Sequence, residues 1–164
     1  MGSVSIKPEF PPLLKPGFHP YGLADLRALC VDGIKSSITR KGIMDRLDEI
    51  AGAIQAAGIS CELWIDGSFV TEKIDPEDVD MLVCVQSDLY DNDPAVKATI
   101  DWASDPDRWN THACDSYKWV EYSSGHPLFA DSEVTRLYWA DWFGVSRRGV
   151  HKGIAVVALS QVRP

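Results

Sequence analysis

The chain has 164 residues, about the size of one globular domain, and 45% of them are hydrophobic, enough to build a core. Its formal net charge of −8 repels phosphate backbones, which argues against non-specific binding of DNA or RNA. The sequence shows no signal-peptide pattern, no apolar run approaching the roughly 20 residues of a membrane span, and no zinc-site spacing among its four cysteines. We therefore expect a cytoplasmic protein with reduced, buried thiols and no membrane association.

The first 22 residues are rich in proline, which fixes φ and removes a hydrogen-bond donor. The prolines are Pro8, Pro11, Pro12, Pro16 and Pro20. This composition favours an extended segment over a helix, so residues 1–22 are expected to form an arm laid on the domain or a loose tail. Residues 23–164 are then expected to form a single domain.

Two helices and a strand are expected next. Apolar residues at helical spacing predict a short helix over residues 23–32 and a longer one over residues 39–57. Gly58 follows the second helix, where a glycine in the left-handed conformation commonly ends a helix. Residues 61–65 then predict a strand, which ends at the turn residues 66–68.

A second strand is expected over residues 79–85, and its alternation is informative. Asp78 and Asp80 share one face with Leu82 and Cys84, while the other face is wholly apolar. Two carboxylates therefore leave the start of a core strand in the same direction, with their Cβ atoms about 7 Å apart.

The last third of the chain predicts a helix over residues 94–103 with Asp93 as its N-cap, a strand over 115–122, a helix over 127–143 and a strand over 153–159. The helix over 127–143 is expected to bury Leu128, Leu137, Tyr138 and Trp142, with Trp139 also in the core. This order of elements predicts an α+β (α/β-like) fold, in which a mixed sheet of about four strands has helices packed mainly on one face.

Acidic residues are concentrated between positions 66 and 80, opposed there only by Lys73. They are Asp66, Glu72, Asp75, Glu77, Asp78 and Asp80. Such a density of like charge is relieved either by exposure to solvent or by a bound divalent cation. Because Asp78 and Asp80 lie at the start of a core strand, they are the residues best placed to share a hard cation.

A strand ending in Gly67-Ser68, followed ten residues later by Asp78-Val79-Asp80, resembles the signature of the polymerase-β-like nucleotidyltransferase superfamily. Within it, the chain looks like a poorly characterised family of small bacterial and phage proteins. That likeness rests on residues 16–20, 64–73, 76–80, 114–115 and 152–154, including the run Gly-Ser-Phe-Val-Thr-Glu-Lys. The resemblance implies a minimal nucleotidyltransferase fold, because the chain is too short to hold an added acceptor domain.

The resemblance also implies roles for particular residues. Asp78 and Asp80 would hold Mg²⁺ or Mn²⁺, while Gly67 and Ser68 would contact the triphosphate at the start of a helix. A third carboxylate, which would complete the metal site and also serve as base, is best matched by Asp115, with Glu121 as the weaker alternative.

The basic residues each have two possible roles. Lys73 either neutralises the acidic loop or reaches the phosphates of the nucleotide. The cluster Arg147, Arg148, His151 and Lys152 is either a solvated loop or a phosphate clamp, and Lys152 is its best candidate for nucleotide binding.

The function expected from this pattern is transfer of a nucleoside monophosphate from an NTP to a hydroxyl of a protein, an RNA end or a small molecule. One alternative is a catalytically silent nucleotide- or partner-binding module of a toxin–antitoxin or phage-defence system, with its protein partner encoded nearby. A weaker alternative is a metal-dependent phosphohydrolase that uses the same acidic site.

Overall fold

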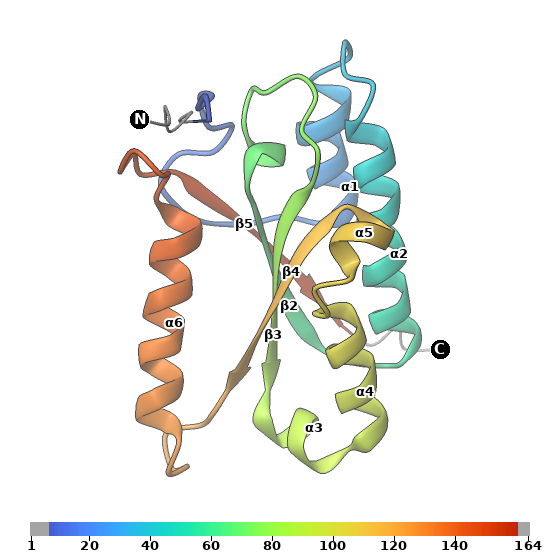
Figure 1. Ribbon diagram of the computed structural model, residues 1–164. Helices are drawn as coiled ribbons and strands as arrows, with labels where there is room; N and C mark the ends of the chain where they lie inside the picture. The colour runs from blue at the N-terminus through green and yellow to red at the C-terminus, as the bar shows by residue number, and fades with distance from the viewer. Residues whose placement is uncertain (1–6, 161–164) are drawn as a thin grey trace, which may run out of the picture.

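The computed structural model describes residues 7–160, whose centre is a five-stranded mixed sheet (Figure 1). In chain order the strands are β1 (Gly17–Pro20), β2 (Cys61–Asp66), β3 (Val79–Gln86), β4 (Cys114–Glu121) and β5 (Gly153–Leu159). Their order in the sheet is β1-β5-β2-β3-β4. The pairs β1–β5 and β3–β4 are parallel, whereas β2 runs antiparallel to both β3 and β5.

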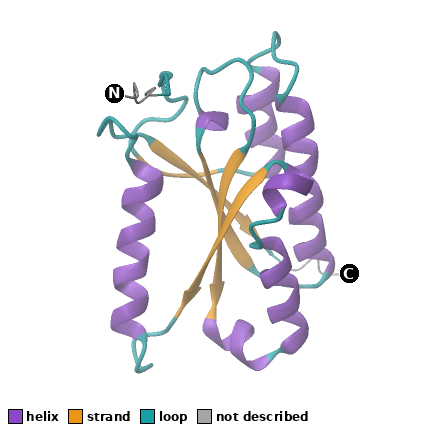
Figure 2. Ribbon diagram, in the orientation of Figure 1, coloured by secondary structure: helices purple, strands orange, loops and turns teal. Residues whose placement is uncertain are grey.

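Helices cover the sheet unequally. They are α1 (Leu23–Arg27), continued by a π-helical turn over Ala28–Asp32, then α2 (Arg40–Ala56), α3 (Ser87–Asn92), α4 (Pro94–Ala103), α5 (Arg108–His112) and α6 (Phe129–Gly144). Helices α1, α2, α4 and α5 lie on one side of the sheet and α6 lies on the other (Figures 1 and 2). This confirms the expected α+β class with helices mainly on one face, although the sheet has five strands rather than four.

The alternation of β3 separates two cores. Val79, Met81 and Val83 belong to the larger cluster, which includes the apolar stripe of α2. Leu82 and Cys84 belong to a smaller cluster with Phe143 of α6. Because both faces of β3 are buried, the strand is held at the centre of the domain, and its first residues are positioned rigidly.

The extra strand comes from the proline-rich arm. Residues 17–20 pair with residues 153–156, and the Leu14 side chain before them is buried. Because β1 is an edge strand, its side away from β5 has no partner strand. Proline is tolerated at position 20 because the N–H that it lacks would point to that open side. The described part of the arm is therefore laid on the domain; its first six residues lie outside the described residues.

The local signals for helix ends behave as expected. The Asp93 side chain accepts hydrogen bonds from the backbone N–H groups of Ala95 and Val96 at the start of α4. Gly58 has φ +69° after α2, in the left-handed region that closes a helix.

The prediction for the α6 side chains was wrong for most of them. Leu128, Leu137, Tyr138 and Trp142 are all exposed, whereas Trp139 packs against the smaller core as expected, together with Phe143. Because α6 carries apolar residues around most of its circumference, helical periodicity could not identify the buried face. An exposed apolar stripe therefore remains on α6, made by Val134, Leu137, Tyr138 and Trp142.

Within residues 7–160, no helix has both the length and the hydrophobicity that a membrane crossing requires.

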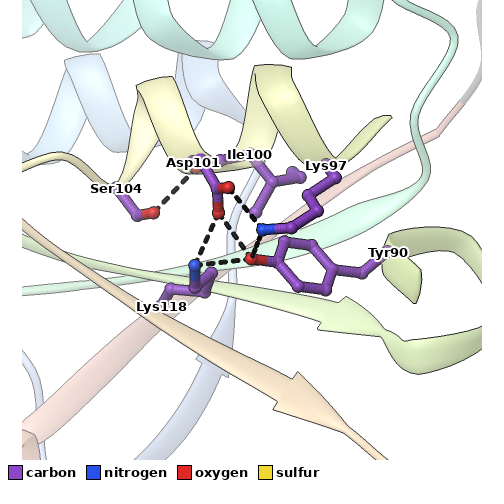
Figure 3. A network of polar contacts seen from close by, with 6 residues as sticks. All are labelled: Tyr90, Lys97, Ile100, Asp101, Ser104 and Lys118. Atoms are coloured by element: carbon purple, nitrogen blue, oxygen red, sulfur yellow. Dashed lines mark hydrogen bonds and ion pairs between the residues drawn. The ribbon is translucent and has the colours of Figure 1, made fainter. Parts of the chain in front are cut away.

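A polar network ties α3 and α4 to β4 at the end of the sheet away from the acidic residues (Figure 3). Asp101 accepts hydrogen bonds from Lys97 (2.7 Å), from Lys118 (2.6 Å) and from the Tyr90 hydroxyl. Both lysines also donate to the Tyr90 oxygen, at 2.8 and 2.7 Å. Partial burial raises the pKa of Asp101, but hydrogen bonds from Lys118, Lys97 and Tyr90 outweigh it and leave the pKa below its usual range.

We expect Asp101→Asn to lower the free energy of unfolding by about 1 kcal/mol at pH 7, a small value because the carboxylate is partly exposed. Since the folded-state pKa is depressed, this contribution is present above about pH 4 and is lost as the pH falls further. Urea unfolding of both proteins at pH 7 and pH 3 measures it. The exposed Asp32, changed to asparagine, is the control. A difference that grows at pH 3 would contradict the ion-pair explanation.

Candidate active site

Carboxylates from three neighbouring strands form a row at one end of the sheet. The strand register pairs Asp66 at the end of β2 with Asp80 near the start of β3, and pairs Asp80 with Asp115 near the start of β4. Residues directly opposite one another on adjacent strands project from the same face. Asp78 lies just before β3 and lines the same cavity as Asp80. Asp66, Asp80 and Asp115 therefore project from the side of the sheet that α6 covers, and Asp78 lies beside them.

Gly67 brings the turn after β2 against this row. Its φ is +82°, and a Cβ added there would lie 2.6 Å from Asp80 Oδ2. Glycine is needed for both the backbone conformation and the close approach. Ser68 begins a 3₁₀ turn, Ser68–Val70, which replaces the expected helix start, so the support from a helix dipole is small.

One cavity of about 590 Å³ brings together the residues that were the best candidates for a metal or nucleotide role, and of the basic cluster it includes Arg147 and Lys152 but not Arg148 or His151. Its walls include Gly67, Ser68, Lys73, Asp78, Asp80, Asp115 and Lys152. A second hollow of about 400 Å³ shares Asp80 and Asp115 with the first and extends to Asp141 and Trp142 of α6. Glu121 is paired with Gln86 at the opposite end of β4, about 20 Å along the strand from Asp115, so it lies outside this site.

The acidic row is electrostatically strained. Burial, together with the negative charges of Asp78, Asp66 and Asp115, raises the pKa of Asp80 to about 7. Burial likewise raises the pKa of Asp66 to about 6, although its Oδ2 lies 2.6 Å from Lys152 Nζ. Lys152 therefore pairs with Asp66, a residue that the sequence did not single out as a site residue. Its place directly before Gly67-Ser68 was the available signal.

Two aromatic side chains hold the outer carboxylates. Trp109 of α5 donates from Nε1 to Asp78 Oδ2 at 2.9 Å, and the Tyr117 hydroxyl donates to Asp115 Oδ2 at 2.9 Å. Each bond occupies one carboxylate oxygen, and both carboxylates line the cavity. No local pattern pointed to Trp109, because it lies 31 residues from its partner Asp78.

Arg40 fixes the loop that joins the glycine–serine turn to the carboxylates. Its side chain is fully buried and, within residues 7–160, forms no ion pair. Its guanidinium donates to backbone oxygens around it: those of Cys30 (2.8 Å), Phe69 (2.6 Å), Thr71 (2.6 Å), Lys73 (2.5 Å) and Ile74 (3.2 Å). Arg40 was not predicted as a site residue, yet it lies three residues before Ile43, on the buried stripe of α2.

The donor set suits a hard divalent cation that is shared with a ligand. Among the described residues, no three Asp, Glu, His or Cys side chains are grouped closely enough to hold a metal ion by themselves. Mg²⁺ commonly takes only one or two protein carboxylates and completes its shell with phosphate oxygens and water. The Asp78–Asp80 pair beside an open cavity fits that pattern, and it does not fit a closed structural metal site.

The fold and site together define a single α+β domain with a carboxylate-lined cavity at one end of a mixed sheet. The model of a family of unknown function, DUF6932, matches residues 8–158, and the chain belongs to this family. No curated protein and no solved structure matches the chain.

Proposed function

We propose that the protein is a cytoplasmic, Mg²⁺-dependent nucleotidyltransferase of the polymerase-β-like type. The observation that supports this most directly is the contact between Gly67 and the Asp80 carboxylate, with Asp78 and Asp115 on the same cavity wall. A glycine–serine turn beside two carboxylates gives a triphosphate a close approach to the backbone and gives a cation its oxygen ligands.

In this proposal each residue has a role that follows from its position in the cavity. Asp78 and Asp80 hold the cation, which when bound neutralises the phosphates and orients the α-phosphorus for in-line attack. The Ser68 hydroxyl donates to a phosphate oxygen, and Lys73 supplies positive charge on the same wall. Lys152 keeps Asp66 ionised and lies beside the phosphates.

Asp115 is the proposed base. The Asp115 carboxylate accepts the proton of the acceptor hydroxyl. The hydroxyl oxygen of the acceptor bonds to the α-phosphorus at the same time, and pyrophosphate leaves. The second hollow gives the acceptor a way to reach this point, because it opens toward α6 and shares the Asp80 and Asp115 walls. The acceptor in this proposal is a hydroxyl of a protein, an RNA end or a small molecule.

A second candidate is a catalytically silent nucleotide- or partner-binding module of a toxin–antitoxin or phage-defence pair. Two observations favour it: the absence of a three-residue metal cluster within residues 7–160, and the exposed apolar stripe of α6. Such a stripe is typical of a surface that a protein partner covers.

Transfer from α-³²P-labelled NTPs into a cell extract tests the enzymatic proposal. The purified protein should label a macromolecule or small molecule and release pyrophosphate; release of phosphate without labelling would instead indicate a phosphohydrolase. If no NTP is consumed, and a partner binds equally well to the Asp78→Asn, Asp80→Asn variant, the silent module is the better account.

Binding of Mg²⁺ together with a nucleotide is expected to stabilise the folded protein. At pH 8, Mg²⁺ with a non-hydrolysable ATP analogue should raise the melting temperature by several degrees, because a ligand that binds only the folded state stabilises it. The rise should vanish in the Asp78→Asn, Asp80→Asn variant and persist in Glu72→Gln, which alters an exposed carboxylate of the same loop. An equal rise in all three proteins would exclude the two carboxylates as ligands. Differential scanning fluorimetry measures it.

A further inference from the structure

The N-terminal arm closes one side of the cavity. Residues 7–10 and 12 contribute to its lining, although they lie more than fifty residues from Gly67 in the chain. We call Pro8, Phe10 and Pro12 the arm wall.

The arm is attached on both sides of the cavity. Toward β2, the Glu72 N–H donates to Pro11 O at 2.9 Å and the Leu13 N–H donates to Val70 O at 3.0 Å. Toward β5, the Glu9 carboxylate accepts from Ser146 Oγ at 3.0 Å and from the Arg148 N–H at 2.9 Å. Because prolines also restrict the backbone between these attachments, the wall is ordered before any ligand arrives.

The cavity lining combines two kinds of group. We call the carboxylates, Ser68 and Lys73 its charged side, and Pro8, Phe10, Pro12 and the exposed Val150 its apolar side. The charged residues Lys7, Glu9 and Arg147 line the cavity as well. Phe10 is 37% exposed and makes no ring-to-ring contact with another aromatic side chain of residues 7–160. Its ring therefore offers exposed aromatic surface to the cavity that it lines.

A ligand that uses both sides must be polyanionic at one end and flat and weakly polar at the other. A cavity of about 590 Å³ lies within the range that holds ligands of nucleotide size. Pyrophosphate or tripolyphosphate would occupy the charged side and leave the arm wall unused. Stacking of a base on an aromatic ring contributes to binding whichever base is present.

We propose that the arm wall is the nucleobase subsite and that the base stacks on Phe10. The inference rests on the proposed function for the identity of the ligand, and it adds the element that distinguishes a nucleotide from a simple polyphosphate. Phe10 is then a specificity residue toward the base and takes no part in the chemical step.

Titration calorimetry with Mg²⁺ tests the subsite, using three probes: the α,β-methylene analogues of ATP and UTP, and inorganic tripolyphosphate. Phe10→Ala should weaken binding of the two nucleotides by at least about fivefold, while tripolyphosphate affinity stays within about twofold. Phe10→Trp should restore nucleotide binding. Phe18→Ala is the matched control, because Phe18 is also an exposed phenylalanine of the arm but packs on Trp64 and does not line the cavity.

The outcomes separate the subsite from the enzyme. If the wild-type protein binds tripolyphosphate as tightly as both nucleotides, or if Phe10→Ala weakens all three probes equally, the subsite is refuted and the metal–phosphate site stands. If nucleotides bind through Phe10 but no nucleotidyl transfer is found, the subsite stands and the enzymatic proposal fails. If none of the probes binds, both fail together.

Discussion

The double variant Asp78→Asn, Asp80→Asn is expected to lose nucleotidyl transfer by at least about a thousandfold. A metal contributes several kcal/mol of charge stabilisation to the transition state, and each 1.4 kcal/mol corresponds to about a tenfold change in rate. Asparagine keeps the shape of each side chain but removes the anionic oxygens that would bind the cation. Initial rates of pyrophosphate release at saturating NTP measure the loss.

The single variant Asp80→Asn should be no less stable than the wild-type protein at pH 8. Burial and the charges of Asp78, Asp66 and Asp115 raise the pKa of Asp80 to about 7, so its charged form is disfavoured in the folded state. This unfavourable contribution develops as the pH rises from about 4, the unfolded-state pKa, through about 7. Loss of activity together with retained or increased stability is the signature of a carboxylate kept for function.

Glu72→Gln provides the control, since Glu72 belongs to the same acidic loop but is exposed. Its transfer rate should stay within about twofold of the wild-type rate. Transfer that continues at the wild-type rate in the double variant would refute the proposed mechanism, whatever the control shows.

Arg40→Met is expected to be the most destabilising single substitution near the site, by at least about 3 kcal/mol. Methionine fills much of the same volume but leaves the carbonyls of Cys30, Phe69, Thr71 and Lys73 without the donor they share, and each buried, unsatisfied acceptor costs about 1–3 kcal/mol. Burial lowers the pKa of Arg40 but leaves it a strong base, so the loss should show little pH dependence between pH 6 and 9.

Urea unfolding measures this prediction, and Arg46→Met is its control. Arg46 is on the same helix and exposed, so its substitution should change stability by no more than about 0.5 kcal/mol. Arg40→Lys should lose an amount of stability between the losses of Arg40→Met and Arg46→Met, because an ammonium group reaches fewer carbonyls than a planar guanidinium does. Equal stability of the Arg40→Met and Arg46→Met variants would show that the loop is held by other contacts.

Local patterns were sufficient for most of the helices and strands. The stripe of α2, the alternation of β3 and the cap at Asp93 each depend on residues within a few positions of one another, and all three predictions were confirmed. The grouping of Gly67, Ser68, Asp78 and Asp80 was also predictable, because a short connection between two adjacent strands leaves their ends side by side.

Other features depended on partners far along the chain. Strand β1 exists because β5 offers it an edge more than 130 residues later, and the buried face of α6 was selected by the sheet from several apolar faces. The choice of Asp115 over Glu121, the pairing of Lys152 with Asp66 and the burial of Arg40 beneath the site loop follow from strand register and packing. Residue types and short-range spacing therefore specified the elements and the acidic pair, while long-range pairing, which no local pattern encodes, decided which side chains complete the cavity.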